Sequence, residues 1–295
     1  MFESIIGASV GFHKIDYTWR DMALYALAVG ADENDLMYTY EKDMKALPSF
    51  GVLPYFGAIN TVPAKPKSFS GAYLAHQLVM KELGRTFPIG LHMGHELIMY
   101  RPFDPIQGTM VFNDTITQLY DRGEGKGIIV ESECPVYDAA GRLICNNISR
   151  SLLPEGGGFG GPAPDRGKLD YPDRAPDAVI DETLSKTQNV LYRLTGDTDA
   201  HHIDPEVANE VTHGRGVFMH GLASFGFACR MLIKSFIPGE PERMKRMSVQ
   251  MRSISYPGTP VQLQAWRTSD HSAIFRYIDA ESGKAILDNC VFEWV

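Results

Sequence analysis

The chain is poor in cysteine, with four among 295 residues and no Cys-x-x-Cys pair: Cys134, Cys145, Cys229 and Cys290. This spacing argues against a disulfide framework and a zinc knuckle, and it favours buried, reduced thiols. The sequence also lacks a run of 18 apolar residues, a basic segment with an apolar run at its start, and a peroxisomal tripeptide at Trp294-Val295. We therefore expect a cytoplasmic protein with no membrane partner.

Basic residues are also in deficit, because 28 Lys and Arg stand against 36 Asp and Glu, for a net charge of −8. Nucleic acids and anionic membrane surfaces require a basic footprint, so neither is an expected partner. A polyanionic ligand would need a local cationic patch, and one run is a candidate for binding phosphates: Arg243, Lys245, Arg246 and Arg252. The alternative is that this run is a solvated face. Lys65 and Lys67, which flank Pro66, are expected on a loop surface.

The two halves of the chain resemble each other. DAAGRLICNN from Asp138 recurs as DAESGKAILDN from Asp279, QGTMV near Gly108 recurs as PGTPV near Gly258, and LYALAVGAD from Leu24 recurs as LYRLTGD. Three similarities in the same order, at offsets of roughly 140 to 170 residues, indicate a duplication. The alternative is chance similarity among common strands and turns.

Local patterns predict similar elements in each half. Thr18 is placed as the N-cap of an amphipathic helix with Asp21 at its third position and an apolar stripe of Leu24, Leu27 and Ala28. Val217, Phe218, Leu222, Phe225 and Met231 keep near-helical spacing, so a helix starting near His220 should be deeply buried. Strands are predicted from residues 261, 273 and 290, and in the first half over the stretches GTMVFNDTITQLY, GIIVESECPVY and RLICNNISRSLL. Residues 154–178, dense in Gly and Pro, are predicted to be a linker.

Residues 191–205, LYRLTGDTDAHHIDP, place Asp197, His202 and Asp204 within eight positions around a Gly turn. A carboxylate and an imidazole can hold a water molecule between a base and an acid. Gly221, just inside the predicted buried helix, can turn its backbone N–H toward a thioester oxygen that is gaining negative charge. Together these residues predict hydration chemistry on an acyl thioester.

Two other features of this region are expected to be structural. Asp204 precedes a proline, which is typical of a turn. His201, His202, His213 and His220 lie near several Asp residues, but their spacing matches no familiar ligand pattern, so no metal is expected.

Four segments in order resemble the hydratase 2 enzymes of the MaoC-like group, which are (R)-specific enoyl-CoA hydratases: YTWRDMALYALAVGA, GGGFGG, YRLTGDTDAHHIDP and HGLASFGFA. The resemblance covers nearly the whole chain. It implies an α+β double hot-dog fold, in which each of two domains is an antiparallel sheet wrapped around a central helix. Residues 1–153 would be a catalytically silent hot-dog that accommodates the acyl chain, residues 154–178 the linker, and residues 179–295 the catalytic hot-dog.

The family pattern G-D-x-N-P-L-H-x-D-P falls on residues 196–205 and implies that Asp197 and His202 are the catalytic pair. The Gly of the H-G-L pattern falls on Gly221, whose N–H would form the oxyanion hole. The resemblance further implies reversible hydration of trans-2-enoyl-CoA to (R)-3-hydroxyacyl-CoA, no cofactor beyond the thioester carrier, and a homodimer. The run His92-Met93-Gly94-His95-Glu96 differs from the family's His-Gly-Glu-Gln, so no catalytic role is expected there.

The chain departs from the family pattern where Asp199-Ala200-His201 replaces Asn-Pro-Leu. One interpretation is an altered pocket or an altered pKa of the neighbouring pair. The other is that both new side chains point to solvent. Two other functions stay open: a hot-dog thioesterase, in which water attacks the thioester carbonyl, and a non-catalytic acyl-CoA-binding partner subunit. The acyl group, and coenzyme A against an acyl-carrier protein, are also open.

Overall fold

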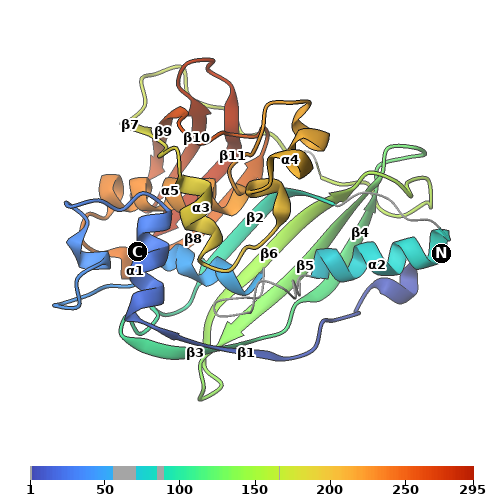
Figure 1. Ribbon diagram of the computed structural model, residues 1–295, viewed down its shortest axis with the longest axis horizontal. Helices are drawn as coiled ribbons and strands as arrows, with labels where there is room; N and C mark the ends of the chain where they lie inside the picture. The colour runs from blue at the N-terminus through green and yellow to red at the C-terminus, as the bar shows by residue number, and fades with distance from the viewer. Residues whose placement is uncertain (1, 56–70, 85–89, 166) are drawn as a thin grey trace.

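A computed structural model describes residues 2–55, 71–84, 90–165 and 167–295; Lys65 and Lys67 lie outside these residues. Its strands form one antiparallel sheet in the order β1-β3-β5-β6-β2-β8-β11-β10-β9-β7, and β4 pairs beside β5 (Figure 1). The strands are β1 (His13–Thr18), β2 (Leu91–Met99), β3 (Gln107–Phe112), β4 (Thr115–Asp121), β5 (Ile128–Tyr137), β6 (Leu143–Leu153), β7 (Ala178–Thr183), β8 (Met244–Met251), β9 (Pro260–Ser269), β10 (Ser272–Asp279) and β11 (Ala285–Trp294).

The helices precede the long strands in each half. They are α1 (Trp19–Ala28), α2 (Gly71–Leu83), α3 (Gln188–Arg193), α4 (Pro205–Thr212) and α5 (Gly221–Phe236). Short 3-10 helices are η1 (Glu3–Ile5), η2 (Leu36–Tyr38), η3 (Pro48–Tyr55), η4 (Ala200–His202) and η5 (Pro241–Arg243). In the residues that the structure describes, no helix combines the length and apolar character needed to cross a membrane.

The order of strands is nearly symmetric about its centre. The first half contributes β1, β3, β5, β6 and β2, and the second half contributes their counterparts β7, β9, β10, β11 and β8 in mirrored order. The halves join through the antiparallel pair β2–β8, where Gly94 lies opposite Gln250. The repeated sequences fall on matching elements, since Asp138 and Asp279 stand at the turns that follow β5 and β10. This arrangement supports the interpretation of a duplication.

Helix α1 begins where the sequence predicts, but it buries a different face. The Asp21 carboxylate accepts hydrogen bonds from the Thr18 N–H at 2.8 Å and from the Thr18 hydroxyl at 2.9 Å. The predicted apolar stripe is wrong in part, because Leu27 is 43% exposed and Leu24 is only half-buried. The buried residues are instead Met22, Ala23, Tyr25, Ala26 and Ala28.

Helix α5 is the buried helix that the sequence predicts, with every residue from Leu222 to Ile233 buried. It starts after His220, so Val217 and Phe218, which keep its spacing, lie outside it. Gly226 permits close packing on α1, since a Cβ there would collide with Val29. The contact brings α5 against the C-cap residue of α1.

A buried arginine ties the halves together. Arg230 on α5 is 2% exposed and pairs with Asp35 of the first half at 3.1 Å and with Glu182 on β7. Its Nε donates to the main-chain oxygen of Val29 at 3.1 Å. Removing one partner of such a buried pair typically costs roughly 3–5 kcal/mol, so this network fixes α5 against α1.

The segment between β6 and β7 runs without helix or strand over its described residues, which begin after Leu153 and end before Ala178. The Asp121 carboxylate accepts hydrogen bonds from the N–H groups of Gly158 and Gly160, each at 2.7 Å. Both glycines have positive φ, which explains the Gly-rich sequence at this point. The four cysteines are all buried and free, as their spacing predicts.

Candidate active site

The loop after α3 carries Asp197 into the protein. Gly196 has φ of +131°, a conformation that side chains rarely adopt, and it turns the next residue inward. Asp197 is 5% exposed, and its Oδ1 accepts a hydrogen bond from the Asp199 N–H at 3.2 Å. Burial raises the pKa of Asp197 to about 7, against the effect of that hydrogen bond, and the charge of Asp199 adds to the rise. The carboxyl group can therefore hold or release a proton near neutral pH.

His202, at the end of η4, lies beside this carboxyl group and is part-buried. Its Nδ1 lies 3.0 Å from the main-chain oxygen of Phe218 and donates to it, and its own main-chain oxygen accepts from Asn189 Nδ2 at 2.6 Å. Removal from water lowers the pKa of His202 to about 4. The neutral ring therefore presents the lone pair of Nε2 as a proton acceptor.

A third polar side chain, His220, lies beside Asp197 and His202, and we call these three residues and the start of α5 the corner. It is 1% exposed and is the N-cap residue of α5. Its ring lies between that of His202, at 3.8 Å between centroids, and that of Tyr192, at 4.8 Å. Burial and then the neighbouring His202 ring hold the pKa of His220 well below its ordinary value, and the main chain of Asp197 opposes this weakly. His220 is therefore neutral.

One oxygen or nitrogen atom from each of Asp197, His202 and His220 lies within 4.8 Å of the other two. By distance alone this group could surround a metal ion, although His213, the C-cap of α4, is not part of it. The two imidazole planes are inclined by only 31° at 3.8 Å between centroids, whereas an ion bound by both rings has to lie where the two ring planes meet. The stacking thus opposes coordination of one ion by both rings.

Gly221 is the first residue of α5 and follows His220 directly. The first N–H groups of a helix have no partner within it and form its positive end. A Cβ at this position would lie 2.7 Å from Met251 Sδ and 3.2 Å from its Cε, so a side chain here would collide with Met251 and glycine fits without displacing it. The structure therefore brings all three of the residues singled out from the sequence into one region.

The side chains of Asp199 and His201, which replace the family's Asn and Leu, do not simply point to solvent. Asp199 Oδ1 accepts from the His201 N–H at 2.9 Å and lies 2.7 Å from His201 Nδ1. Although burial opposes it, these hydrogen bonds hold the pKa of Asp199 below its ordinary value. The ionised carboxylate in turn favours the protonated forms of Asp197 and His202. This agrees with the interpretation in which the substitution alters the pKa of the pair.

Asp204 has the structural role that its proline neighbour indicates. It is the N-cap of α4, and its carboxylate accepts from the Glu206 N–H at 2.9 Å.

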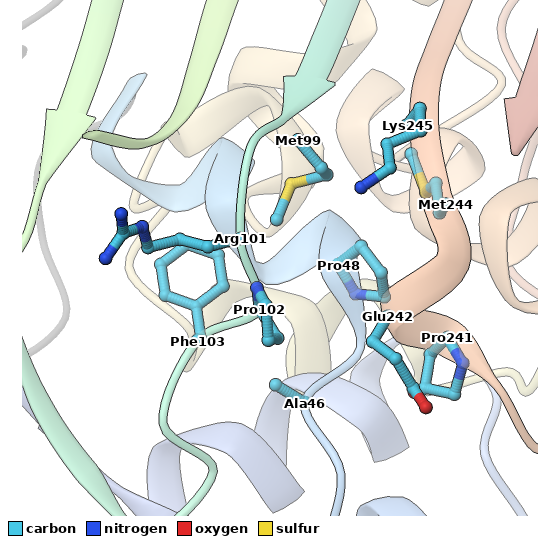
Figure 2. A pocket seen from close by; sticks show the side chains of 10 residues that line it. All are labelled: Ala46, Pro48, Met99, Arg101, Pro102, Phe103, Pro241, Glu242, Met244 and Lys245. Atoms are coloured by element: carbon cyan, nitrogen blue, oxygen red, sulfur yellow. The ribbon is translucent and has the colours of Figure 1, made fainter. Parts of the chain in front are cut away.

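The four cations proposed for phosphate binding do not form one patch. Strand β8 rises about 3.3 Å per residue, so its two ends lie about 23 Å apart. Arg243 pairs with Glu240, and Arg246 pairs with Glu96 and Glu293. Lys245 lines a hollow between η5, the start of β8 and the segment after β2 (Figure 2). Only Arg252, exposed and next to Met251, lies at the Gly221 end of the strand.

The fold and this corner define a class: a double hot-dog protein with a carboxyl–imidazole pair beside the start of its buried helix. The MFE-2 hydratase 2 N-terminal domain matches residues 15–154, and the MaoC-like domain matches residues 168–289. A MaoC-like dehydratase from Phytophthora capsici superposes with a TM-score of 0.83 at 28% identity, covering 98% of this chain and 96% of that chain. A Mycobacterium tuberculosis protein described as having a double hot-dog fold superposes at 0.59 with 15% identity, covering 98% and 96%.

Curated relatives support the same family. The chain is 30% identical to a probable enoyl-CoA hydratase 2 of Dictyostelium discoideum, over 95% of this chain and 93% of that protein. It is also 30% identical to 3-hydroxyacyl-thioester dehydratase Y of M. tuberculosis, over 98% and 97%. The mouse peroxisomal multifunctional enzyme type 2 is 30% identical over the whole chain, which spans 38% of that enzyme. The protein therefore belongs to the MaoC-like hydratase 2 family, and the predicted family and double hot-dog fold are confirmed.

Proposed function

We propose that the protein catalyses the reversible hydration of trans-2-enoyl-CoA thioesters to (R)-3-hydroxyacyl-CoA. The observation that carries this proposal is that Asp197 and neutral His202 present polar atoms within 4.8 Å of each other and of His220, the residue that precedes the first turn of α5. The relatives named enoyl-CoA hydratase 2 and 3-hydroxyacyl-thioester dehydratase support the same reaction.

The thioester oxygen accepts a hydrogen bond from the Gly221 N–H, at the positive end of α5. This contact strengthens as the oxygen gains charge in the enolate-like transition state, and it makes the β-carbon electrophilic. A donor of this kind is typically worth roughly 10²–10³ in rate. Met251, which crowds the position of a Gly221 Cβ, narrows the approach to this donor.

Asp197 and His202 share one proton during the addition. Since the pKa of Asp197 is about 7 and that of His202 about 4, the proton resides mainly on the carboxyl group between these values. His202 Nε2 takes a proton from water as the water oxygen bonds to the β-carbon, and the Asp197 carboxyl delivers its proton to the α-carbon on the same face. Transfer of the proton from His202 to Asp197 restores the pair, and the reverse sequence is dehydration.

No metal or redox group enters these steps, so the reaction would need no cofactor beyond the thioester carrier. We propose that the first half, which has Met37 where the second has His202, is catalytically silent and that the acyl chain lies against it. A reducing compartment, the cytoplasm, suits the four free buried thiols. A homodimer is our proposal as well, supported by exposed apolar side chains on the neighbouring helices α1 and α3 and at the C-cap of α3: Leu27, Val190 and Leu194.

The test is turnover of a panel of trans-2-enoyl-CoA thioesters that differ in chain length and branching. Loss of the enoyl absorbance without release of free thiol, and a product of (R) configuration by chiral chromatography, are the expected results. Thiol release would instead indicate a thioesterase. Tight binding with no turnover across the panel would favour a non-catalytic subunit. Sedimentation at several protein concentrations measures the oligomeric state.

A further inference from the structure

His220 is a buried polar side chain with no well-formed hydrogen bond from either ring nitrogen among the described residues, and the main chain of Asp197 acts on it only as a poorly aligned partner. It is 1% exposed, and the rings of His202 and Tyr192 pack against it. Leaving a buried donor or acceptor unpaired typically costs about 1–3 kcal/mol, so such a group in a folded protein needs an explanation. Stacking alone does not supply one, because a phenyl ring would stack without this cost.

The spacing of the polar atoms is compatible with a water molecule beside His220. The chosen atoms of Asp197, His202 and His220 lie within 4.8 Å of one another. Two atoms that each hydrogen-bond one water at 2.8 Å, at a tetrahedral angle, are about 4.6 Å apart. Two ligands of a zinc ion at about 2.1 Å are about 3.4 Å apart. The limit of 4.8 Å leaves room for one water molecule that hydrogen-bonds to all three atoms.

A count of donors and acceptors assigns each partner a role. His202 Nδ1 donates to the Phe218 main chain, so its Nε2 can only accept, and an Asp197 carboxyl oxygen also accepts. These two acceptors engage both protons of a water molecule. One lone pair of the water attacks the β-carbon, so a fourth partner has to be a donor.

We propose that His220 is a third catalytic residue of the proposed hydration, donating a ring N–H to the oxygen of the attacking water. This rests on the proposed function. The donor orients the water so that its free lone pair points at the β-carbon. In dehydration the same N–H stays hydrogen-bonded to the leaving hydroxyl oxygen and stabilises the partial negative charge that it carries until His202 has returned its proton, which makes this contact stronger in the transition state.

The test compares His220→Phe with His220→Gln, using an enoyl-CoA that the wild-type enzyme turns over. The Phe variant keeps a ring against His202 and Tyr192 but has no donor, whereas Gln restores an N–H. We expect kcat to fall by about 10- to 100-fold for Phe, with KM changed by less than about threefold, and Gln to recover about a tenth or more of the wild-type kcat. A Phe variant within threefold of wild type overturns the proposal, and so does a folded Gln variant as slow as Phe.

Two controls separate failure of this inference from failure of the proposed function. Wild-type turnover and a dead Asp197→Asn variant establish the reaction independently of His220. If His220→Phe does not fold, an experimental high-resolution structure of the wild-type enzyme decides. A water within 3.2 Å of Asp197, His202 and His220 is expected. A His220 ring whose nitrogens bond only to the protein, such as the Asp197 main chain, contradicts the assignment.

Discussion

Replacing Asp197 by Asn should stabilise the protein at alkaline pH while abolishing its activity. The carboxyl group has an ordinary pKa of 3.8, and burial raises it to about 7 in the folded protein. Between these values the folded state keeps a proton that the unfolded state releases, so the free energy of unfolding falls as pH rises. Each pKa unit corresponds to about 1.4 kcal/mol, so ionised Asp197 costs the fold about 4 kcal/mol above pH 7.

Asn is neutral at every pH and keeps an oxygen that can accept from the Asp199 N–H. The variant should therefore gain up to about 4 kcal/mol over wild type at pH 8, and less than about 2 kcal/mol at pH 5. For a chain of this size each kcal/mol raises Tm by roughly 2–4 °C, so a rise of roughly 10 °C is expected at pH 8.

The measurement is thermal and urea unfolding of both proteins at pH 5 and pH 8, with hydration assayed on the same samples. Asp32→Asn is the matched control from the first half, because a hydrogen bond from the Asn34 N–H lowers the pKa of this exposed carboxylate and the sign of its effect is opposite. A gain for Asp197→Asn that is absent, or equal at both pH values, would refute this account of its burial.

Asp197→Asn and His202→Gln should each lower kcat/KM by several orders of magnitude, and the double variant should be little worse; additive losses would argue against one catalytic unit. The wild-type pH profile should be a bell with limbs near pH 4 and pH 7, falling about tenfold per pH unit outside them, and a flat profile would contradict the shared proton. Asp199→Asn removes a charge that raises both pKa values, so both limbs should move to lower pH, and an upward shift would show that the sign is wrong. Gly221→Val should lower kcat by about 10²–10³, measured beside product affinity by calorimetry; unchanged kcat would remove the oxyanion role.

The sequence predicts those parts of this protein whose determinants are local. Thr18 and Asp21 mark the start of α1, and alternation within residues 260–294 marks β9, β10 and β11. The Gly196-Asp197 turn and the helix start at His220 are also local signals. These local features explain why the sequence singles out Asp197, His202 and Gly221, which the structure brings into one region.

Features that depend on distant partners are missed. The close approach of Gly226 on α5 to Val29, the C-cap residue of α1, joins distant parts of the chain and no pattern within α1 reveals it. The sequence of the central strand β8 resembles a run of charged surface residues. Its strand structure is not evident from that pattern because Arg246 is neutralised by Glu96, which lies on β2 and is distant in sequence. The stacking of His220 on His202 arises only when α5 folds against the loop after α3, although the histidine just before the helix start was an available signal.

The groups around the first residue of α2 differ from those around the first residue of α5, and this difference supports a single active site. In the order of elements α2 corresponds to α5, so Gly71 corresponds to Gly221. The Gly71 N–H donates to the carboxylate of Asp114 at 2.5 Å, and a Cβ on Gly71 would meet Ser132 at 2.7 Å. Asp114 is fully buried, which raises its pKa to about 6. A thioester oxygen could not compete with a carboxyl group already held at the positive end of α2. Within the described residues of the first half, the Asp114 carboxyl group thus occupies the N–H of Gly71, and this contrast supports our proposal that the enolate oxygen is stabilised at Gly221.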